Sequence, residues 1–227
     1  MGAGYKRITG KKFASVALAA LGTLLFTACL ALSAFARLST DGKVYYSIQM
    51  DQSVEAGISA DEMLELDMLL ADYLAGDENA LDETEAFHER EKAHMVDVFE
   101  IFEVVRLVRS ICFFAGAVFL AGAVMLREKC AAWGALIGAG LFFLPLIATG
   151  IWAAVDFSSA FTAMHHLLFS NDLWLMDPRT DLMIRMLPQR FFVNIAAYIG
   201  CGTGIAALCA PVICFLGLRG AAKILNK

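Results

Sequence analysis

Four long apolar runs dominate the chain, at roughly 13–36, 104–126, 131–155 and 191–218. Each is close to the ~20 residues that a helix needs to cross the hydrocarbon core of a bilayer. Because backbone groups in lipid must find hydrogen bonds within their own segment, each run is predicted to be a transmembrane helix. The pattern therefore predicts an all-α membrane protein: a single membrane domain over 1–227, with four transmembrane helices and an outward-facing helical loop subdomain.

The first long polar segment, 37–103, has a helical pattern of its own. Ser59 is a good helix cap, Glu62 follows it at the capping-box position, and Gly76 is a plausible stop. Apolar residues recur between them at helical spacing, which predicts an amphipathic helix over 59–74 whose acids form a solvated face. The preceding stretch, 43–50, is typical of extended backbone. A further helix is expected to begin near Thr84 and to continue into the second apolar run.

The basic residues indicate an orientation. They flank the apolar runs in three clusters: Lys6, Arg7, Lys11 and Lys12; Arg127 and Lys129; Arg219, Lys223 and Lys227. With four spans, all three clusters fall on one side, which the positive-inside rule makes cytoplasmic. Both termini are then inside, and the loops 37–103 and 156–190 face outward, so that any site they carry would lie on the extracellular side.

Two interpretations of the first run stay open. The sequence S-A-F-A at 33–36 resembles a signal-peptidase site, but the run from Phe13 to Ala36 is longer than the ~7–15 residues of a signal peptide. A retained anchor helix and a cleaved signal are therefore both considered.

Composition excludes some classes of function. The chain is 59% hydrophobic, and its net charge of −5 comes mostly from acids in the first outer loop. An acidic chain lacks the basic face that binds nucleic acid. The six cysteines lie in or beside apolar runs without a C-x-x-C pair, so neither disulfides nor zinc is predicted.

The segment E-R-E-K-A-H-M-V-D-V at 89–98 is the first candidate for chemistry. On a helix, Glu91, His94 and Asp97 share one stripe, and a histidine between carboxylates can have its ring oriented and its cation favoured. The simpler interpretation is an exposed, salt-bridged helix start. A metal site formed by His88, Glu91 and His94 is a further alternative.

The segment 161–192 is the second candidate. It places His165, His166, Asn171 and Trp174 among three Asp and three Arg residues between two apolar runs. Titratable residues at the mouth of a membrane bundle are candidates for function. The adjacent histidines point ~100° apart on a helix, so only one can face a given pocket. The simpler interpretation is a hydrogen-bonded interfacial histidine with Trp174 as an interfacial anchor.

Together the two segments resemble the lipoprotein intramolecular transacylases of bacterial membranes. That family is similar in having four spans, a first outer loop ending in E-R-E-x-x-H-M-x-D-V, and a second close to F-H-x-x-F-x-N-D-x-W-x-x-D-P-x-x-D-x-x-I-x-x-L-P-x-x-F-F. The matching positions are Glu89, Arg90, Glu91, His94, Met95, Asp97 and Val98, then His165, Phe169, Asn171, Asp172, Trp174, Asp177, Pro178, Asp181, Ile184, Leu187, Pro188, Phe191 and Phe192. The family's phenylalanine before the histidine is Met164 here.

The resemblance implies a membrane acyltransferase that moves the sn-2 acyl chain of a diacylglyceryl-Cys lipoprotein to the α-amino group of that Cys, giving a lyso-form lipoprotein. Its partners would be such bacterial lipoproteins and membrane lipid, and no cofactor or metal is required. The resemblance also implies a bacterial cytoplasmic membrane, with the active site on the extracellular side. The alternatives are a non-catalytic scaffold or sensor and the metal-dependent hydrolase.

Roles follow from the chemistry of this transfer. His165 is expected to be the general base, and His94 or His165 would return the proton to the leaving oxygen. Asp172 or Asp97 could orient a histidine, and the candidate oxyanion donors are Asn171, Trp174 and Arg190. Substrate contacts are expected from Trp174, Arg190, Glu91 and Asp177.

Overall fold

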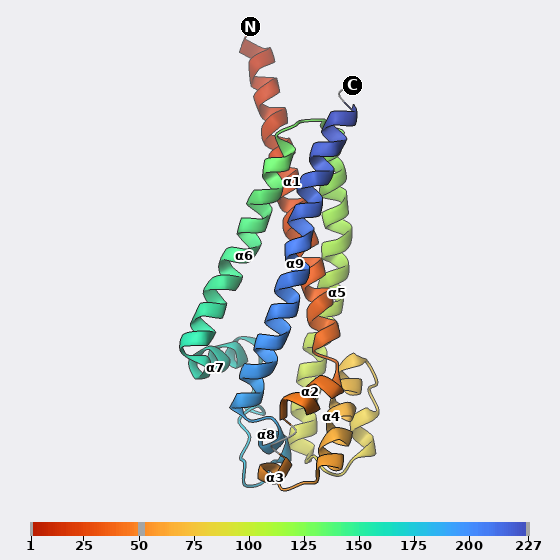
Figure 1. Ribbon diagram of the computed structural model, residues 1–227, viewed down its shortest axis with the longest axis vertical. Helices are drawn as coiled ribbons and strands as arrows, with labels where there is room; N and C mark the ends of the chain where they lie inside the picture. The colour runs from red at the N-terminus through yellow and green to blue at the C-terminus, as the bar shows by residue number, and fades with distance from the viewer. Residues whose placement is uncertain (1, 50–52, 226–227) are drawn as a thin grey trace. The chain divides into compact units, whose positions relative to one another are not determined.

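The computed structural model describes residues 2–49 and 53–225, and every regular element within these ranges is helical (Figure 1). In these ranges four helices are long and apolar enough to cross a membrane: α1 (Gly2–Leu38), α5 (Glu89–Met125), α6 (Ala131–Val155) and α9 (Gln189–Leu225). The shorter elements are α2 (Gly42–Gln49), α3 (Ser53–Ala56), α4 (Ala60–Ala75), the 3-10 helix η2 (Ala80–Glu83), α7 (Phe157–Leu168) and α8 (Leu182–Met186). The prediction of an all-α membrane protein with four membrane helices is confirmed.

The chain divides into two compact units. Unit 1 contains the chain up to Ala34, Leu107–Gly150 and the chain from Thr203, whereas unit 2 contains Phe35–Arg106 and Ile151–Gly202. The sequence ranges of unit 2 therefore take in both polar loops, and those of unit 1 take in the three basic clusters. Of these clusters, Lys227 lies outside the described residues.

Small residues on α1 allow the helices of unit 1 to pack closely. Ser15, Ala19, Thr23 and Thr27 recur every fourth residue and are completely buried. The facing positions of α6 are glycines: a Cβ on Gly138 would lie 2.3 Å from the carbonyl oxygen of Ala20. Small residues at such positions let two backbones approach, which is how helices associate in lipid without a hydrophobic driving force.

The opposite surfaces of these helices are apolar and exposed. On α6, Leu141, Leu144 and Ile147 are each more than half exposed, and only 17% of its most apolar window is buried. Apolar surface on this scale is a liability in water but matches the hydrocarbon of a bilayer. The exposure supports the assignment of α6 as a membrane-spanning helix.

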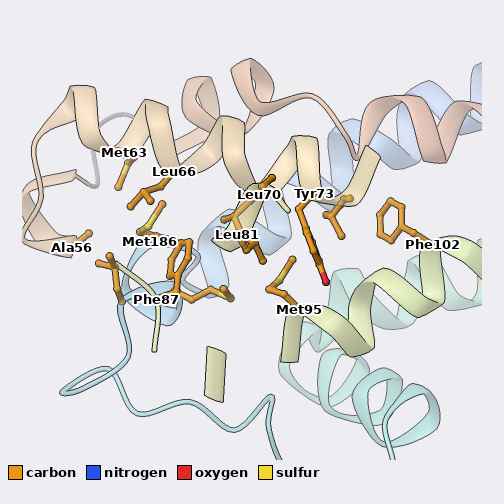
Figure 2. Packing of buried hydrophobic residues seen from close by; sticks show 14 residues of the cluster. Ala56, Met63, Leu66, Leu70, Tyr73, Leu81, Phe87, Met95, Phe102 and Met186 are labelled. Carbon is orange, nitrogen blue, oxygen red and sulfur yellow. The ribbon is translucent and has the colours of Figure 1, made fainter. Parts of the chain in front are cut away.

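Unit 2 is organised around α4. One face of α4, including Met63, Leu66 and Leu70, is almost completely buried in a cluster with η2, α5 and α8 (Figure 2). Met95 of α5 and Met186 of α8 belong to the same cluster. This packing brings together the end of the first polar loop and the second polar loop, which carry the candidate residues.

The predicted ends of α4 are confirmed. The Ser59 side chain accepts the Glu62 N–H, and Gly76 closes the helix at a φ of 128° with its N–H bonded to Asp72 and Tyr73 carbonyls. The prediction that all its acids are solvated is wrong for Asp67, which is completely buried and accepts a hydrogen bond from the Gln49 side-chain amide. Burial raises the pKa of Asp67 to about 7, although the Gln49 hydrogen bond acts in the opposite direction.

The prediction of extended backbone over 43–50 is wrong, since Gly42–Gln49 form α2; Met50 lies outside the described residues. The residues are β-branched and aromatic, which favours strands only where a pleated surface is available. Here Tyr45 packs edge-on to Phe191, and Gln49 meets Asp67 of α4. A helical turn places both on one face, so burial against two helices outweighs local propensity.

The predicted start of the helix that continues into the second apolar run is also wrong, by five residues. Rather than beginning near Thr84, α5 begins at Glu89. The Thr84 hydroxyl accepts the Ala86 N–H in a local turn, and the Glu91 carboxylate accepts the His88 N–H, which caps the helix one residue before it begins. These side-chain contacts compete with the helix over 84–88.

The close approach at Gly138 gives a test of the unit 1 packing. We expect Gly138→Ala to destabilise the protein by about 1–3 kcal/mol, because the added Cβ must push α1 and α6 apart. Gly140→Ala is the matched control, since no atom lies within 4 Å of its Cβ position. Thermal unfolding of both variants in detergent checks the difference, and equal midpoints would contradict the packing.

Candidate functional site

His165 is held in one orientation by its own helix. It lies near the end of α7, is 7% exposed, and places Nδ1 2.8 Å from the carbonyl oxygen of Phe161. A carbonyl only accepts, so Nδ1 carries the proton and Nε2 of the neutral ring keeps its lone pair. Burial lowers the pKa of His165, although the hydrogen bond to Phe161 acts in the opposite direction. The lowered pKa keeps the His165 ring neutral near pH 7, with Nε2 as the nitrogen that can accept a proton.

His94 comes from the other polar loop and lies beside His165. The two rings are stacked, with centroids 6.4 Å apart and planes 25° apart. His94 is 8% exposed, and its Nδ1 is buried with no hydrogen-bond partner among the described residues. The structure thus brings together the two histidines that the sequence singled out separately.

Aromatic rings enclose this histidine pair. The ring centroids of Phe161, Trp174 and Phe169 lie 3.9, 4.8 and 5.5 Å from that of His165. His166 instead is exposed, and its ring meets that of Trp174 in an edge-on arrangement at 5.2 Å. As their ~100° separation on a helix predicts, the adjacent histidines lie in different environments, His165 buried and His166 exposed. The Trp174 ring lies against His165, a contact that the interpretation of Trp174 as an interfacial anchor did not predict.

Asn171 ties the second loop to α5. Its Nδ2 donates to Oδ2 of Asp97 at 2.9 Å, and its Oδ1 accepts the N–H of Leu173. The Trp174 indole N–H in turn donates to the Asn171 carbonyl at 3.1 Å. Asp97 lies one helical turn after His94, so this network lies beside the histidine pair.

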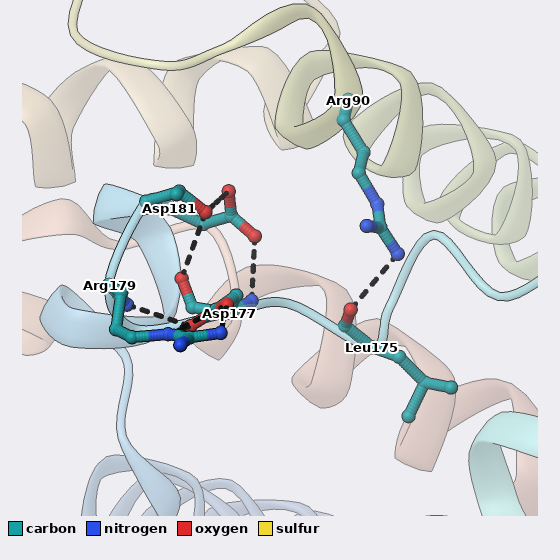
Figure 3. A network of polar contacts seen from close by, with 6 residues as sticks. Arg90, Leu175, Asp177, Arg179 and Asp181 are labelled. Carbon is teal, nitrogen blue, oxygen red and sulfur yellow. Dashed lines mark hydrogen bonds and ion pairs between the residues drawn. The ribbon is translucent and has the colours of Figure 1, made fainter.

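Arg90 and Glu91 hold the same loop from the start of α5. Arg90 donates to the backbone carbonyls of Asp172 and Leu175, at 2.8 and 3.0 Å; Figure 3 shows the contact with Leu175. Glu91 is completely buried, and its two oxygens accept the N–H groups of His88 and Met183 at 2.7 and 2.6 Å. The interpretation of this segment as an exposed, salt-bridged helix start is therefore wrong for Glu91 and His94, which are buried, whereas Glu89 and Arg90 are exposed.

Three other predicted residues are engaged with neighbours. The Asp177 carboxylate binds the Arg179 guanidinium at 2.6 Å, and the Asp177 N–H donates to Asp181 (Figure 3). Arg190 forms an exposed ion pair with Glu55 at 2.8 Å. Asp172 is exposed, and its backbone carbonyl, rather than its carboxylate, makes the contact with Arg90.

Sequence reasoning missed two contributors. The Phe161 carbonyl fixes the tautomer of His165, and its signal was the four-residue helical spacing between the two. Arg90 lies in the first motif, but no role was predicted for it. Nothing in the sequence indicates that its partners are backbone carbonyls more than eighty positions away.

The alternative metal site does not form. Glu91 would have to give up two backbone hydrogen bonds, and His88 is exposed. Within residues 2–49 and 53–225, no three His, Cys, Asp or Glu side chains are grouped so that they could hold an ion.

Comparison with known proteins places this arrangement in a family. The sequence profile described as "Lipoprotein intramolecular transacylase Lit" matches residues 19–192. A search of curated proteins found no match.

Solved structures of the membrane integral lipoprotein intramolecular transacylase Lit from Bacillus cereus share the fold. One is 21% identical and covers 92% of this chain and 96% of its own, with a TM-score of 0.72. Variants in which a histidine is replaced by arginine or by alanine are 19% and 20% identical, with TM-scores of 0.71 and 0.67. The arginine variant is covered over 99% of both chains and the alanine variant over 98% of both.

A family profile that matches most of the chain, together with four membrane helices, favours the transacylase over the non-catalytic scaffold. The chain belongs to the lipoprotein intramolecular transacylase family and is a multi-pass membrane enzyme of that class.

Proposed function

We propose that the enzyme moves the sn-2 acyl chain of a diacylglyceryl-modified lipoprotein to the α-amino group of its N-terminal cysteine. The observation that carries this proposal is the pairing of His165, whose Nε2 is a free base, with His94. An O-to-N transfer needs one proton removed from the amine and one returned to the glycerol oxygen. Two buried imidazoles side by side supply both functions.

The reaction balances within one substrate molecule. The amine nitrogen attacks the ester carbonyl carbon while Nε2 of His165 takes the amine proton. The ester C–O bond then breaks, and His165 or His94 gives the proton to the glycerol oxygen. Since nucleophile and ester belong to one molecule, holding them in contact supplies much of the rate enhancement.

His94 is the best-placed candidate to assist the developing charge. Its buried Nδ1, which has no hydrogen-bond partner among the described residues, can donate to the oxyanion or to the leaving oxygen once substrate is bound. The Asn171 amide and the Trp174 indole already donate to Asp97 and to the Asn171 carbonyl, so we assign them to positioning and to the wall around His165. Burial and the neighbouring His165 lower the pKa of His94 to about 4, so His94 donates as a neutral ring, and the Asp97 carboxylate opposes this shift.

Three of the remaining predicted residues, Glu91, Asp172 and Asp177, do not contact the substrate in this proposal. Glu91, whose oxygens are both occupied by backbone N–H groups, is a positioning residue rather than a substrate contact. The same role suits Asp172 and Asp177, which shape the second loop through backbone and Arg179 contacts. Arg190, which is exposed and paired with Glu55, can still exchange this partner for a substrate or headgroup anion.

The first prediction from this proposal concerns the base. His165→Ala should lower acyl transfer by about 10²- to 10⁴-fold, the usual contribution of a general base. His166→Ala is the matched control and should fall by less than about tenfold, because its ring lies outside the pair.

The assay must separate isomers, since the transfer leaves the mass of the lipoprotein unchanged. Fragmentation mass spectrometry of the N-terminal lipopeptide would detect the amide-linked chain, and an amine-reactive tag would detect loss of the free α-amine. Near-normal conversion by His165→Ala, at equal enzyme level, would remove the proposed base.

A second prediction follows from the pKa of His165. Because burial lowers it, we expect the ring to titrate below the ordinary 6.5. NMR of the full chain in detergent, with the signal identified by its absence from His165→Ala, measures the midpoint. The neutral base is then present at pH 7 and is lost only as pH falls through this lowered value. A midpoint at or above pH 6.5 would contradict the burial of a neutral base.

A third prediction concerns the side of the membrane. We propose that the site faces the extracellular side, because the basic clusters indicate that both termini are cytoplasmic. Cysteines introduced at the exposed Ser47 and Ser170 should react with a membrane-impermeant maleimide in intact cells.

Cys130, in the short connection between α5 and α6, is a natural control for the opposite side. It should react only after permeabilisation, and the unmodified chain supplies the labelling background. Reaction of Ser170→Cys only after permeabilisation would place the site on the cytoplasmic side.

A further inference from the structure

Unit 1 contains a cavity that the acyl transfer does not use. An open cavity of about 430 Å³ lies between the segment around Lys129–Trp133 and the last turns of α9. Its lining combines three cations with apolar groups: Lys129, Ala132, Trp133, Phe215, Arg219, Ala222 and Lys223. The candidate histidines belong to unit 2, so this is a separate site.

The electrostatics of the cavity favour an anion. Glu128 is the one acid among the 23 Asp and Glu residues of the chain that falls within the sequence ranges of unit 1. It does not line the cavity and lies 3.8 Å from Lys11. The ion pairs found among the described residues involve none of the three lining cations. Three positive charges therefore converge, and none of them is paired with a carboxylate of the described residues.

The apolar groups favour an anion that carries a hydrophobic tail. Trp133 is 64% exposed, and Phe215 supports the Arg219 guanidinium, which lies 5.4 Å from its ring centroid. The neighbouring surface is apolar and open, with Leu136 and Ile137 on α6 and Leu216 on α9 all about half exposed or more. A free phosphate would use the cations alone, whereas a phospholipid would use the cations, the aromatic rings and the apolar surface.

We propose that this cavity binds the phosphate of an anionic phospholipid. Arg219, Lys129 and Lys223 hold the headgroup, and Trp133 lies beside the glycerol backbone. Basic pockets between membrane helices are a known mode of anionic lipid recognition, and tryptophan favours the headgroup level. The inference does not depend on the proposed acyl transfer.

The test is lipid retention by the full chain in a neutral detergent, measured by native mass spectrometry. The unmodified chain should retain phosphatidylglycerol in preference to phosphatidylcholine with the same acyl chains. Near an anionic lipid each basic side chain contributes about a fivefold factor in affinity. Arg219→Gln should therefore weaken retention about fivefold, and replacement of all three cations by Gln should weaken it on the order of 10²-fold.

Lys12→Gln is the matched control, because Lys12 is an exposed cation of the same unit that does not line the cavity. It should change retention by less than about twofold. An equal loss in Lys12→Gln and Arg219→Gln would mean that general surface charge, rather than the cavity, binds the lipid.

A thermal midpoint for each variant without lipid separates misfolding from lost binding. If the triple variant unfolds early, the single Arg219→Gln variant and the lipid preference of the unmodified chain still decide the question. Phosphatidylglycerol should raise the midpoint of the unmodified chain, and inorganic phosphate at equal concentration should not. Equal retention of the two lipids, or an equal shift with inorganic phosphate, would overturn the proposal.

Discussion

Glu91 is completely buried, and its two carboxylate oxygens accept the N–H groups of His88 and Met183. An isolated buried carboxylate costs several kcal/mol, so it persists only where its hydrogen bonds are satisfied. Hydrogen bonds to a charged group contribute about 1.5–3 kcal/mol each. The two hydrogen bonds of Glu91 hold two different helices in place. One caps α5, which carries His94, and the other fixes the start of α8 in the loop that follows His165. The relation between the two halves of the candidate site depends on this carboxylate.

Arg90 extends the same constraint. Its guanidinium binds two carbonyls of the second loop, Asp172 and Leu175, on either side of Trp174. Backbone contacts of this kind hold a loop in place without using its side chains. The side chain of Trp174 therefore remains able to pack on His165. Two consecutive residues at the start of α5, Arg90 and Glu91, therefore both bind backbone groups of the second loop.

Different forces stabilise the two units. In unit 2, α4 buries large apolar side chains such as Met63 and Leu70, as in a protein that folds in water. In unit 1, packing depends on small residues such as Ala19, Thr23 and Gly138. Lipid is as apolar as the side chains, so the hydrophobic effect does not drive these helices together, and close van der Waals contact stabilises their association instead. The acids follow the same division, with Glu128 the one acid in the ranges of unit 1.

The sequence by itself determined the features that depend on local pattern. Four apolar runs required four membrane helices, because no other backbone satisfies its hydrogen bonds in lipid. The ends of α4 at Ser59 and Gly76 followed from capping chemistry. Helical spacing placed Glu91, His94 and Asp97 on one stripe and separated His165 from His166.

Only the tertiary structure decided which of these side chains meet. The stacking of His94 on His165, the burial of Asp67 and the helical form of α2 depend on partners far along the chain, and local spacing carries no information about them. The same holds for Glu91 and Arg90, whose partners are backbone groups of the second loop. Backbone groups are the same for every residue, so no sequence motif records that a distant side chain will bind them.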